Sequence, residues 1–239
     1  MTTADAIVLP VNVRPSRYQI WLQPNFTDFS FAGEETIEVE VVEPTSQIQL
    51  NSVEIDIQSA TLSQGGNSHP ASEISFDTKR ETATLSFDES IPAGAASLKL
   101  IFSGELNDKL RGFYRSQYTA IGGMTKHLAT TQFEATDARR AFPCWDEPDF
   151  KSIFSISIIS NENYVRIGNE KVLDEKKLDD GRIETKFVDS IIMSSYLVAF
   201  VIGPLEVTEI GTVGETLVRI VHRPGFSNDT KYAGRATIM

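Results

Sequence analysis

The sequence predicts an all-β protein made of several antiparallel sheets. Short segments of alternating apolar and polar residues recur along most of the 239 residues, and a period of two places every second side chain on the buried face of a strand. Gly, Asn, Pro and Asp separate these segments, as they do at turns. Short strands at this spacing are typical of antiparallel sheets.

The first hundred residues carry the clearest alternation. In RYQIWLQ (17–23), Tyr18, Ile20 and Leu22 share one face and predict a half-buried strand. The same pattern predicts further strands at residues 36–42, 53–57, 73–77, 82–87 and 97–102.

The alternation returns in the second half of the chain. It predicts strands at residues 154–159, 182–188, 194–202 and 216–222. No Gly/Ser-rich or Pro-rich linker separates the two series, so we expect one β-domain over residues 1–226.

Residues 227–239 carry a different pattern. Ser227, Asn228 or Asp229 could cap a helix that runs to Met239, although Gly234 weakens it. A helix of about two turns at a chain end is marginal in water unless it docks on something. We expect these residues to begin a linker helix to a catalytic domain that this chain lacks.

Composition excludes several classes of partner and compartment. The formal net charge is −11, without a basic cluster to offset it, which argues against nucleic acid and anionic membranes. A single cysteine forms no internal disulfide, and the longest apolar run, YLVAFVIGPL (196–205), is too short to cross a bilayer. The first residues do not resemble a secretory signal, so we predict a cytoplasmic protein.

The motifs of several enzyme classes are missing from the sequence. His69, His127 and His222 are not spaced to share a helix face, and none belongs to a zinc-protease motif. Neither a nucleophile elbow nor a phosphate-binding loop occurs. The sequence predicts no metal ligand and no catalytic residue in this chain.

Residues 130–148, TTQFEATDARRAFPCWDEP, form the densest polar stretch. We expect the acids beside Arg139 and Arg140 to form ion pairs that pin a loop to the sheet. The prolines and aromatics of FPCWDEP (142–148) then predict a rigid corner. The acids concerned are Glu134, Asp137, Asp146 and Glu147.

Glu134 also allows a functional interpretation. Alternation in TTQFEAT places Gln132 and Glu134 together on one side, at the end of a strand. A carboxylate held there is suited to bind an ammonium group through a charge-assisted hydrogen bond. Spacing alone leaves open whether Glu134 is such a ligand or an ordinary exposed side chain.

Three long motifs resemble a known family. They are LRGFYRSQYT (110–119), ATTQFEATDARRAFPCWDEPDFKSIFSISI (129–158) and MSSYLVAFVIG (193–203). Together with the opening strands from residue 9 to residue 41, they resemble the N-terminal domain of the zinc aminopeptidases that include aminopeptidase N and the cytosolic puromycin-sensitive aminopeptidase.

The resemblance implies a saddle-shaped all-β domain that covers a catalytic domain. The catalytic domain of the family carries a Gly-Ala-Met-Glu-Asn motif and a zinc-binding His-Glu-x-x-His helix, and neither motif occurs here. The last residue of the family motif that matches TQFE binds the free α-amine of the substrate. This position is Glu134, with Gln132 as a neighbour that lines the cleft.

Two functional hypotheses follow. The first is the substrate-capping domain of a cytosolic zinc aminopeptidase that removes N-terminal residues from peptides, inactive by itself and without a cofactor of its own. Its partners would be peptide N-termini, bound through Glu134 once the domain is joined to a catalytic domain. The alternative is a non-catalytic β-domain that binds or regulates a full-length aminopeptidase.

Overall fold

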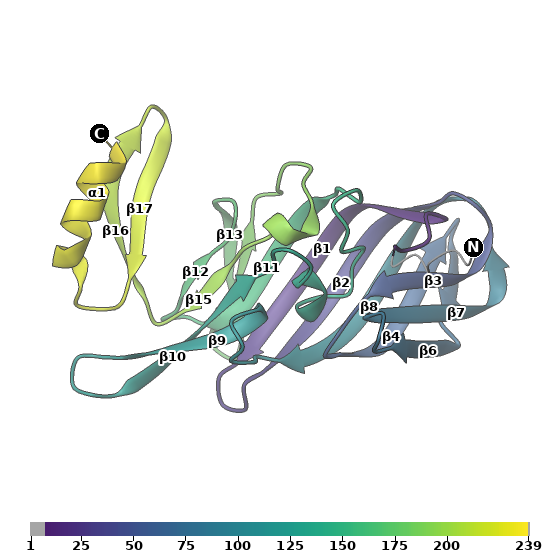
Figure 1. The fold of residues 1–239 in the computed structure, drawn as a ribbon, viewed down its shortest axis with the longest axis horizontal. Coiled ribbons are helices and arrows are strands. Elements are labelled where there is room, and N and C mark those ends of the chain that lie inside the picture. The colour runs from purple at the N-terminus through teal and green to yellow at the C-terminus, as the bar shows by residue number, and fades with distance from the viewer. Residues whose placement is uncertain (1–7, 239) are drawn as a thin grey trace, which may run out of the picture.

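The computed structural model describes residues 8–238, whose strands form four sheets (Figure 1). The prediction of an all-β protein is confirmed. The largest sheet has eight strands in the order β13-β14-β11-β1-β2-β8-β4-β5. Its strands are β1 (Val13–Asn25), β2 (Ser30–Val41), β4 (Ile55–Gln64), β5 (Asn67–Pro70), β8 (Gly94–Glu105), β11 (Ile153–Asn161), β13 (Val172–Lys177) and β14 (Arg182–Phe187).

Three smaller sheets complete the fold. A three-stranded sheet has the order β3-β7-β6, a four-stranded sheet the order β12-β15-β10-β9, and the last is a hairpin of β16 and β17. Their strands are β3 (Thr45–Asn51), β6 (Glu73–Asp77), β7 (Thr82–Ile91), β9 (Gly112–Thr119), β10 (Thr125–Gln132), β12 (Val165–Ile167), β15 (Val201–Gly203), β16 (Glu206–Val213) and β17 (Thr216–His222).

The helical segments are short. Three are 3₁₀ turns and one is an α-helix, and none of those in residues 8–238 has the length and apolar character needed to cross a bilayer. They are η1 (Ala138–Arg140), η2 (Ser195–Leu197), η3 (Ser227–Asp229) and α1 (Thr230–Ile238).

One strand pair departs from the predicted antiparallel pattern. β1 and β11 pair in parallel, with Arg17 opposite Ile153 and Leu22 opposite Ile158. Hairpin turns impose antiparallel pairing only on strands that follow one another closely. The chain between β1 and β11 passes through the other sheets, so their relative direction could not be inferred from local alternation.

A continuous apolar core lies against the inner face of the eight-stranded sheet. Ile20 of β1 and Leu100 of β8 are fully buried in it, as are Ile48 of β3 and Leu85 of β7 from the three-stranded sheet. Burying apolar side chains from two sheets in one core is the main source of stability for such a fold.

Two glycine–phenylalanine pairs let β2 and β8 pack large rings into this core. Gly33 lies opposite Phe102, and Phe31 lies opposite Gly104. A Cβ atom at Gly33 would lie 2.2 Å from the Phe102 ring, and one at Gly104 would lie 2.4 Å from the Phe31 ring. Each ring therefore covers the glycine across from it, which explains why both glycines occur inside strands.

The predicted strand at residues 194–202 is wrong. This segment forms η2 and only the short strand β15. Side chains bind it instead of a neighbouring strand: Ser195 donates from Oγ to Asp146 Oδ1 at 2.6 Å, and the Phe200 N–H donates to Thr131 Oγ1 at 3.1 Å. Such bonds compete with the ladder of a sheet.

The other boundaries differ less. β4 begins at Ile55 and not at residue 53, because the Val53 N–H donates to the Arg139 carbonyl and Glu54 has a φ of 58°. Residues 227–229, the predicted helix caps, instead form the 3₁₀ turn η3, and α1 begins directly after it at Thr230. No side-chain hydrogen bond caps the start of η3.

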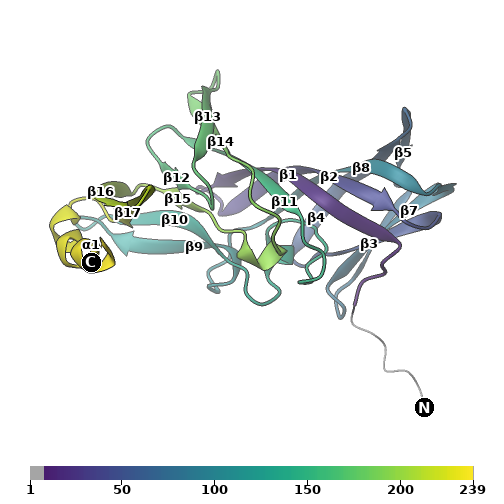
Figure 2. The ribbon, with the colours of Figure 1, turned by 90° about the horizontal axis from the view of Figure 1, so that it is seen from above.

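The C-terminal residues form a unit beyond the end of the large sheet. Figures 1 and 2 show α1 packed on the hairpin of β16 and β17, drawn in yellow and yellow-green. Gly234 of α1 allows this contact, since a Cβ atom there would lie 2.8 Å from the Ile210 side chain. The domain boundary between residues 226 and 227 stays a prediction.

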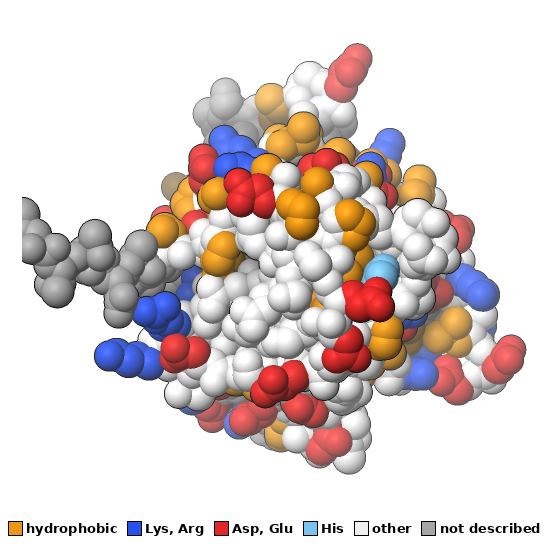
Figure 3. All heavy atoms as spheres, turned by 90° about the vertical axis from the view of Figure 1, so that its right-hand side faces the viewer, with side chains coloured by type: hydrophobic (Ala, Val, Ile, Leu, Met, Phe, Trp, Pro, Cys, Tyr) orange, Lys and Arg blue, Asp and Glu red, His pale blue; other side chains and the backbone are white. Residues whose placement is uncertain are grey.

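The opposite end of the molecule carries scattered charges. In the view onto this end, acidic side chains lie among neutral atoms, and the lysine and arginine side chains lie toward the periphery (Figure 3). This distribution is in keeping with the net charge of −11.

Candidate functional site

Glu134 lies immediately beyond the end of β10. The strand ends at Gln132, two residues earlier than the alternation of TTQFEAT suggests, and the peptide bond between Glu134 and Ala135 is cis. Gln132 and Glu134 are exposed and the intervening Phe133 is buried. The amide and the carboxylate are therefore both open to solvent.

The Glu134 carboxylate is free of protein partners. Among residues 8–238 it forms no hydrogen bond and no ion pair, and the same holds for the Gln132 side-chain amide. Most of the other acids of this stretch are paired. A carboxylate left unpaired at a rigid position can bind a cation without first breaking an internal contact.

Phe133 fixes the position of Glu134. Its ring packs edge-on against Phe142, with 6.0 Å between ring centroids, and against Phe200 at 6.3 Å. The Phe133 carbonyl accepts a hydrogen bond from the Asp137 N–H at 2.9 Å, which closes the turn after Glu134. A buried ring and a closed turn hold the backbone on both sides of the carboxylate.

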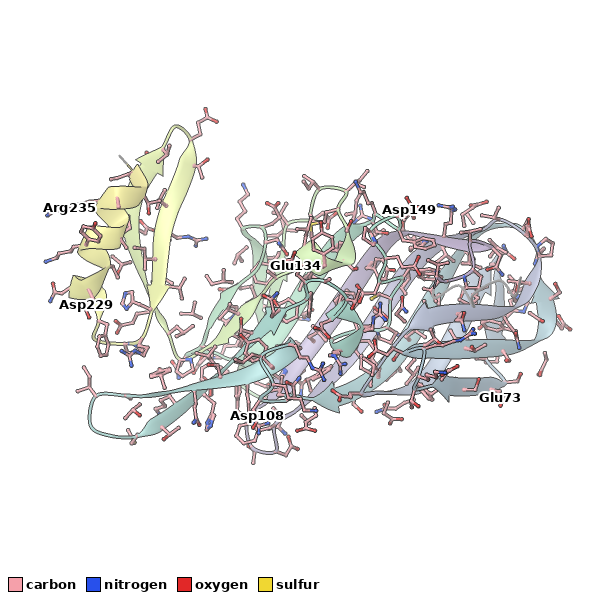
Figure 4. The ribbon with its side chains drawn as sticks, in the orientation of Figure 1. Glu73, Asp108, Glu134, Asp149, Asp229 and Arg235 are labelled. Atoms are coloured by element: carbon pink, nitrogen blue, oxygen red, sulfur yellow. The ribbon has the colours of Figure 1, made fainter. Side chains whose placement is uncertain are left out.

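Gln132 and Glu134 line a hollow of about 390 Å³. Its other wall comes from η2 and the residues after it, including Tyr196 and Leu197. A carboxylate and an amide facing aliphatic and aromatic groups could hold an ammonium group together with an adjacent apolar group. Figure 4 shows Glu134 in the middle of the molecule, far from Glu73 at its right-hand end.

The predicted corner is confirmed by the contacts of Arg139 and Asp146. The Arg139 guanidinium donates from Nε to Asp146 Oδ2 at 3.0 Å and from Nη1 to Glu81 Oε2 at 3.1 Å. Asp146 is almost fully buried: its carboxylate also accepts from Ser195 Oγ, and its backbone N–H donates to Asn51 Oδ1 at 3.0 Å. These bonds join the corner to η2 and to β3.

Arg140 makes a second set of ion pairs. It contacts Asp137 at 2.7 Å, Glu54 at 2.7 Å and Glu81 at 3.3 Å. Glu54 and Glu81 come from turns far away in the sequence, so the predicted partners were incomplete. The prediction also placed Glu134 and Glu147 near these arginines, but Glu147 instead accepts from the Leu9 N–H at 2.6 Å, and Glu134 remains outside the network.

Cys144 and Tyr18 lie beneath this corner. The Cys144 carbonyl accepts from the Asn51 N–H at 2.8 Å, and the Tyr18 hydroxyl accepts from the Trp145 N–H at 3.2 Å. Burial raises the pKa of the Cys144 thiol well above its usual value. The thiol is therefore protonated and packed, which suits a structural role and not a nucleophilic one.

No group of three metal-ligating side chains occurs within the described residues 8–238. The unpaired carboxylate of Glu134 is a single ligand, whereas a catalytic zinc site needs three. Among residues 8–238, the side chains that line the hollow at Glu134 therefore do not supply the ligand set of a zinc ion.

The assignment of Gln132 and Glu134 to a binding site stays a prediction, and the sequence did not single out the opposite wall of the hollow. Alternation predicts a strand at Tyr196 and Leu197, in which successive side chains would point to opposite faces. In η2 both line the hollow. The serines before them, Ser194 and Ser195, are the local signal for a turn that side-chain hydrogen bonds stabilise.

The sequence matches the model of one protein family. Residues 14–197 match the model of the Peptidase M1 N-terminal domain. The match ends within η2, before β15 and the C-terminal hairpin.

Curated relatives extend the similarity beyond residue 197. The chain is 44% identical to Aminopeptidase 2 of Candida albicans over 199 residues, which are 83% of this chain and 21% of that protein. It is 38% identical to the puromycin-sensitive aminopeptidase of Caenorhabditis elegans, over 94% of this chain and 24% of that protein. For the mitochondrial Aminopeptidase 2 of Saccharomyces cerevisiae the values are 36% identity, 98% of this chain and 25% of that protein. The chain thus spans about a quarter of the length of these relatives.

Proposed function

The chain belongs to the Peptidase M1 N-terminal domain family, and from this premise we propose that it is the substrate-capping part of an aminopeptidase. In this role Glu134 binds the free α-amino group of a peptide, and Gln132 lines the same cleft. The peptide bond is cleaved by a zinc-dependent catalytic domain that adjoins this one in a longer cytoplasmic protein.

The unpaired Glu134 carboxylate carries this proposal. An α-ammonium group offers three hydrogen-bond donors and a full positive charge, and a carboxylate is its natural acceptor. Asp137 and Asp146 are engaged with Arg140 and Arg139, so they are not available for the same task.

An exopeptidase must also place the first peptide bond at a fixed distance from the reacting group. Holding the terminal ammonium at a rigid position does this, because it converts a loose encounter into one defined geometry. Phe133 and the turn to Asp137 provide the rigidity. We assign binding and orientation to this chain and the hydrolytic chemistry to the catalytic domain.

Replacing Glu134 by glutamine is the first test. The matching segment of Candida albicans Aminopeptidase 2 can be exchanged for this chain, and the hybrid assayed on an aminoacyl amide. Hydrogen bonds to charged groups contribute about 1.5–3 kcal/mol, so Glu134→Gln should lower kcat/KM by about ten- to a hundredfold. The zinc content of the hybrid should not change.

Glu73→Gln is the matched control. Glu73 is an exposed glutamate at the far end of the molecule (Figure 4), so the same chemical change there should leave kcat/KM unaltered. Equal values of kcat/KM for Glu134→Gln and its parent hybrid would remove Glu134 from the site.

The isolated chain should be inactive. Because residues 8–238 hold no group of metal ligands, we expect no hydrolysis of an aminoacyl amide by the purified 239-residue chain, with or without added zinc. The unexchanged Candida albicans enzyme serves as the positive control. Zinc-dependent turnover that co-purifies with this chain would contradict the assignment of hydrolysis to another domain.

A second candidate function rests on exposed apolar side chains beside the hollow. Ile191 is 75% exposed, Ile192 66% and Leu197 48%, and contiguous apolar surface of this kind marks interaction sites. A non-catalytic β-domain that binds a full-length aminopeptidase could use it. Stable association of the separate chain with such an enzyme, lost in Ile192→Ser, would favour this function over the first.

A further inference from the structure

Glu35 occupies an unusual position for a glutamate. It lies on β2 in the middle of the eight-stranded sheet, opposite Ile20 of β1 and Leu100 of β8. All three side chains are fully buried in the apolar core. The neighbouring acids of the strand, Glu38 and Glu40, point to solvent instead.

No hydrogen bond satisfies the Glu35 carboxyl group. Both oxygens are buried, and neither has a partner within the described part of the chain. Buried polar groups almost always have a partner, and a buried carboxylate without a cation is far more costly than a neutral carboxyl group. The site therefore favours the protonated acid.

Among residues 8–238, no positively charged side chain acts on the Glu35 carboxyl group. On the adjacent strands β1 and β8 its cross-strand neighbours are Ile20 and Leu100. The titratable groups that sense its charge are Tyr18 of β1 and Cys144 of the corner, both buried and both neutral when protonated. Ionisation of Glu35 would place a negative charge beside two acids, Tyr18 and Cys144, that burial keeps neutral.

Burial alone raises the pKa of Glu35 well above its ordinary value of 4.5. The pKa values of Tyr18 and Cys144 are raised mainly by the same burial. All three raised pKa values are those expected of ionisable groups buried in an apolar core.

We propose that Glu35 is a pH-sensitive element of this fold, uncharged in the native state, whose ionisation at rising pH opens the core beneath the corner that contains Cys144. The corner carries Arg139 and Asp146 and supports the turn after Glu134. A less tightly packed core would therefore also loosen the hollow lined by Gln132 and Glu134.

The sign of the effect follows from proton linkage. In the unfolded chain Glu35 ionises near its ordinary pKa, whereas in the folded chain it stays protonated to higher pH. The folded state thus binds the extra proton at Glu35. The contribution of Glu35 to stability is therefore fully present below its ordinary pKa and is lost as the pH rises through the folded pKa. One proton changes the unfolding constant by at most tenfold per pH unit.

Urea unfolding between pH 5 and pH 9 tests the proposal on the 239-residue chain. The ratio of the unfolding constants of wild type and Glu35→Gln should rise with pH, by up to tenfold per unit, because glutamine has a similar shape and no charge. The control is Glu40→Gln, because Glu40 is exposed on the same strand. The ratio of the unfolding constants of wild type and Glu40→Gln should not change with pH. A flat ratio for Glu35→Gln as well would overturn the proposal.

Modification of Cys144 by a maleimide gives a second measurement. The thiol is fully buried, so it reacts only from opened states of the protein. The ratio of the wild-type rate to the rate of Glu35→Gln should rise with pH, and the comparison cancels the titration of the thiol itself. If Glu35→Gln does not fold, Glu35→Leu replaces it in both experiments. Equal pH profiles of this variant and wild type would refute the proposal.

Discussion

Replacing Asp146 by alanine should destabilise the chain by about 3–5 kcal/mol, as expected when one partner of a buried ion pair is removed. The Asp146 side chain is 1% exposed and that of Arg139 is 10% exposed. Without the carboxylate, Glu81 is the one ionic partner left to Arg139 within the described residues 8–238. A largely buried guanidinium then lacks part of its compensating charge.

The loss would extend beyond one ion pair. Asp146 also accepts from Ser195 Oγ at 2.6 Å, and this bond holds η2, which forms one wall of the hollow at Glu134. We therefore expect Asp146→Ala to expose both the corner and η2 to solvent more often than in the parent chain.

Denaturant unfolding monitored by circular dichroism would measure the change in the free energy of unfolding. Asp149→Ala is the matched control, because Asp149 lies three residues further along the chain, just after the corner, and is exposed. Its effect should stay within about 0.5 kcal/mol. If Asp146→Ala and Asp149→Ala lowered the free energy of unfolding by similar amounts, the ion pair between Arg139 and Asp146 would not stabilise the corner.

Much of the fold could be predicted from alternation, because solvent on one side and the core on the other impose a period of two. β6 and β17 coincide with the predicted segments. Alternation carries no information on strand order, so the parallel pairing of β1 with β11 could not be predicted. It also failed at η2, where Ser194 Oγ donates to the Pro148 carbonyl and Ser195 Oγ donates to Asp146 Oδ1, so that side-chain bonds and not strand pairing hold the segment.

The candidate site shows the same limit. Gln132 and Glu134 are neighbours in sequence, and their shared side follows from local geometry. Glu54 and Glu81 approach Arg140 only through the tertiary fold, and their own segments carry no sign of that contact. Glu35 is the converse case: a period of two places it on the same face as Ile37 and Val39, but a charged side chain just before the predicted segment would ordinarily be expected in solvent.

Phe142 connects the fold to the candidate site. Its fully buried ring contacts Tyr18 of β1 at 6.2 Å, Phe133 at 6.0 Å and Phe154 of β11 at 6.3 Å, measured between ring centroids. It thus joins the central strands of the large sheet to the residue that precedes Glu134. Removing this ring should affect both the stability of the core and the position of the carboxylate.

Phe142→Ala should lower the free energy of unfolding by about 3–5 kcal/mol, since the buried ring is lost and the cavity left behind closes only in part. Phe76→Ala is the control: Phe76 is 46% exposed on β6, and we expect less than about 1 kcal/mol there. Phe142→Leu retains much of the buried volume and should fall between the two. In the hybrid enzyme, Phe142→Leu should also raise KM for aminoacyl amides, because Phe133 then positions Glu134 less firmly. A stability loss without any change in KM would mean that the turn after Phe133 suffices to hold the carboxylate.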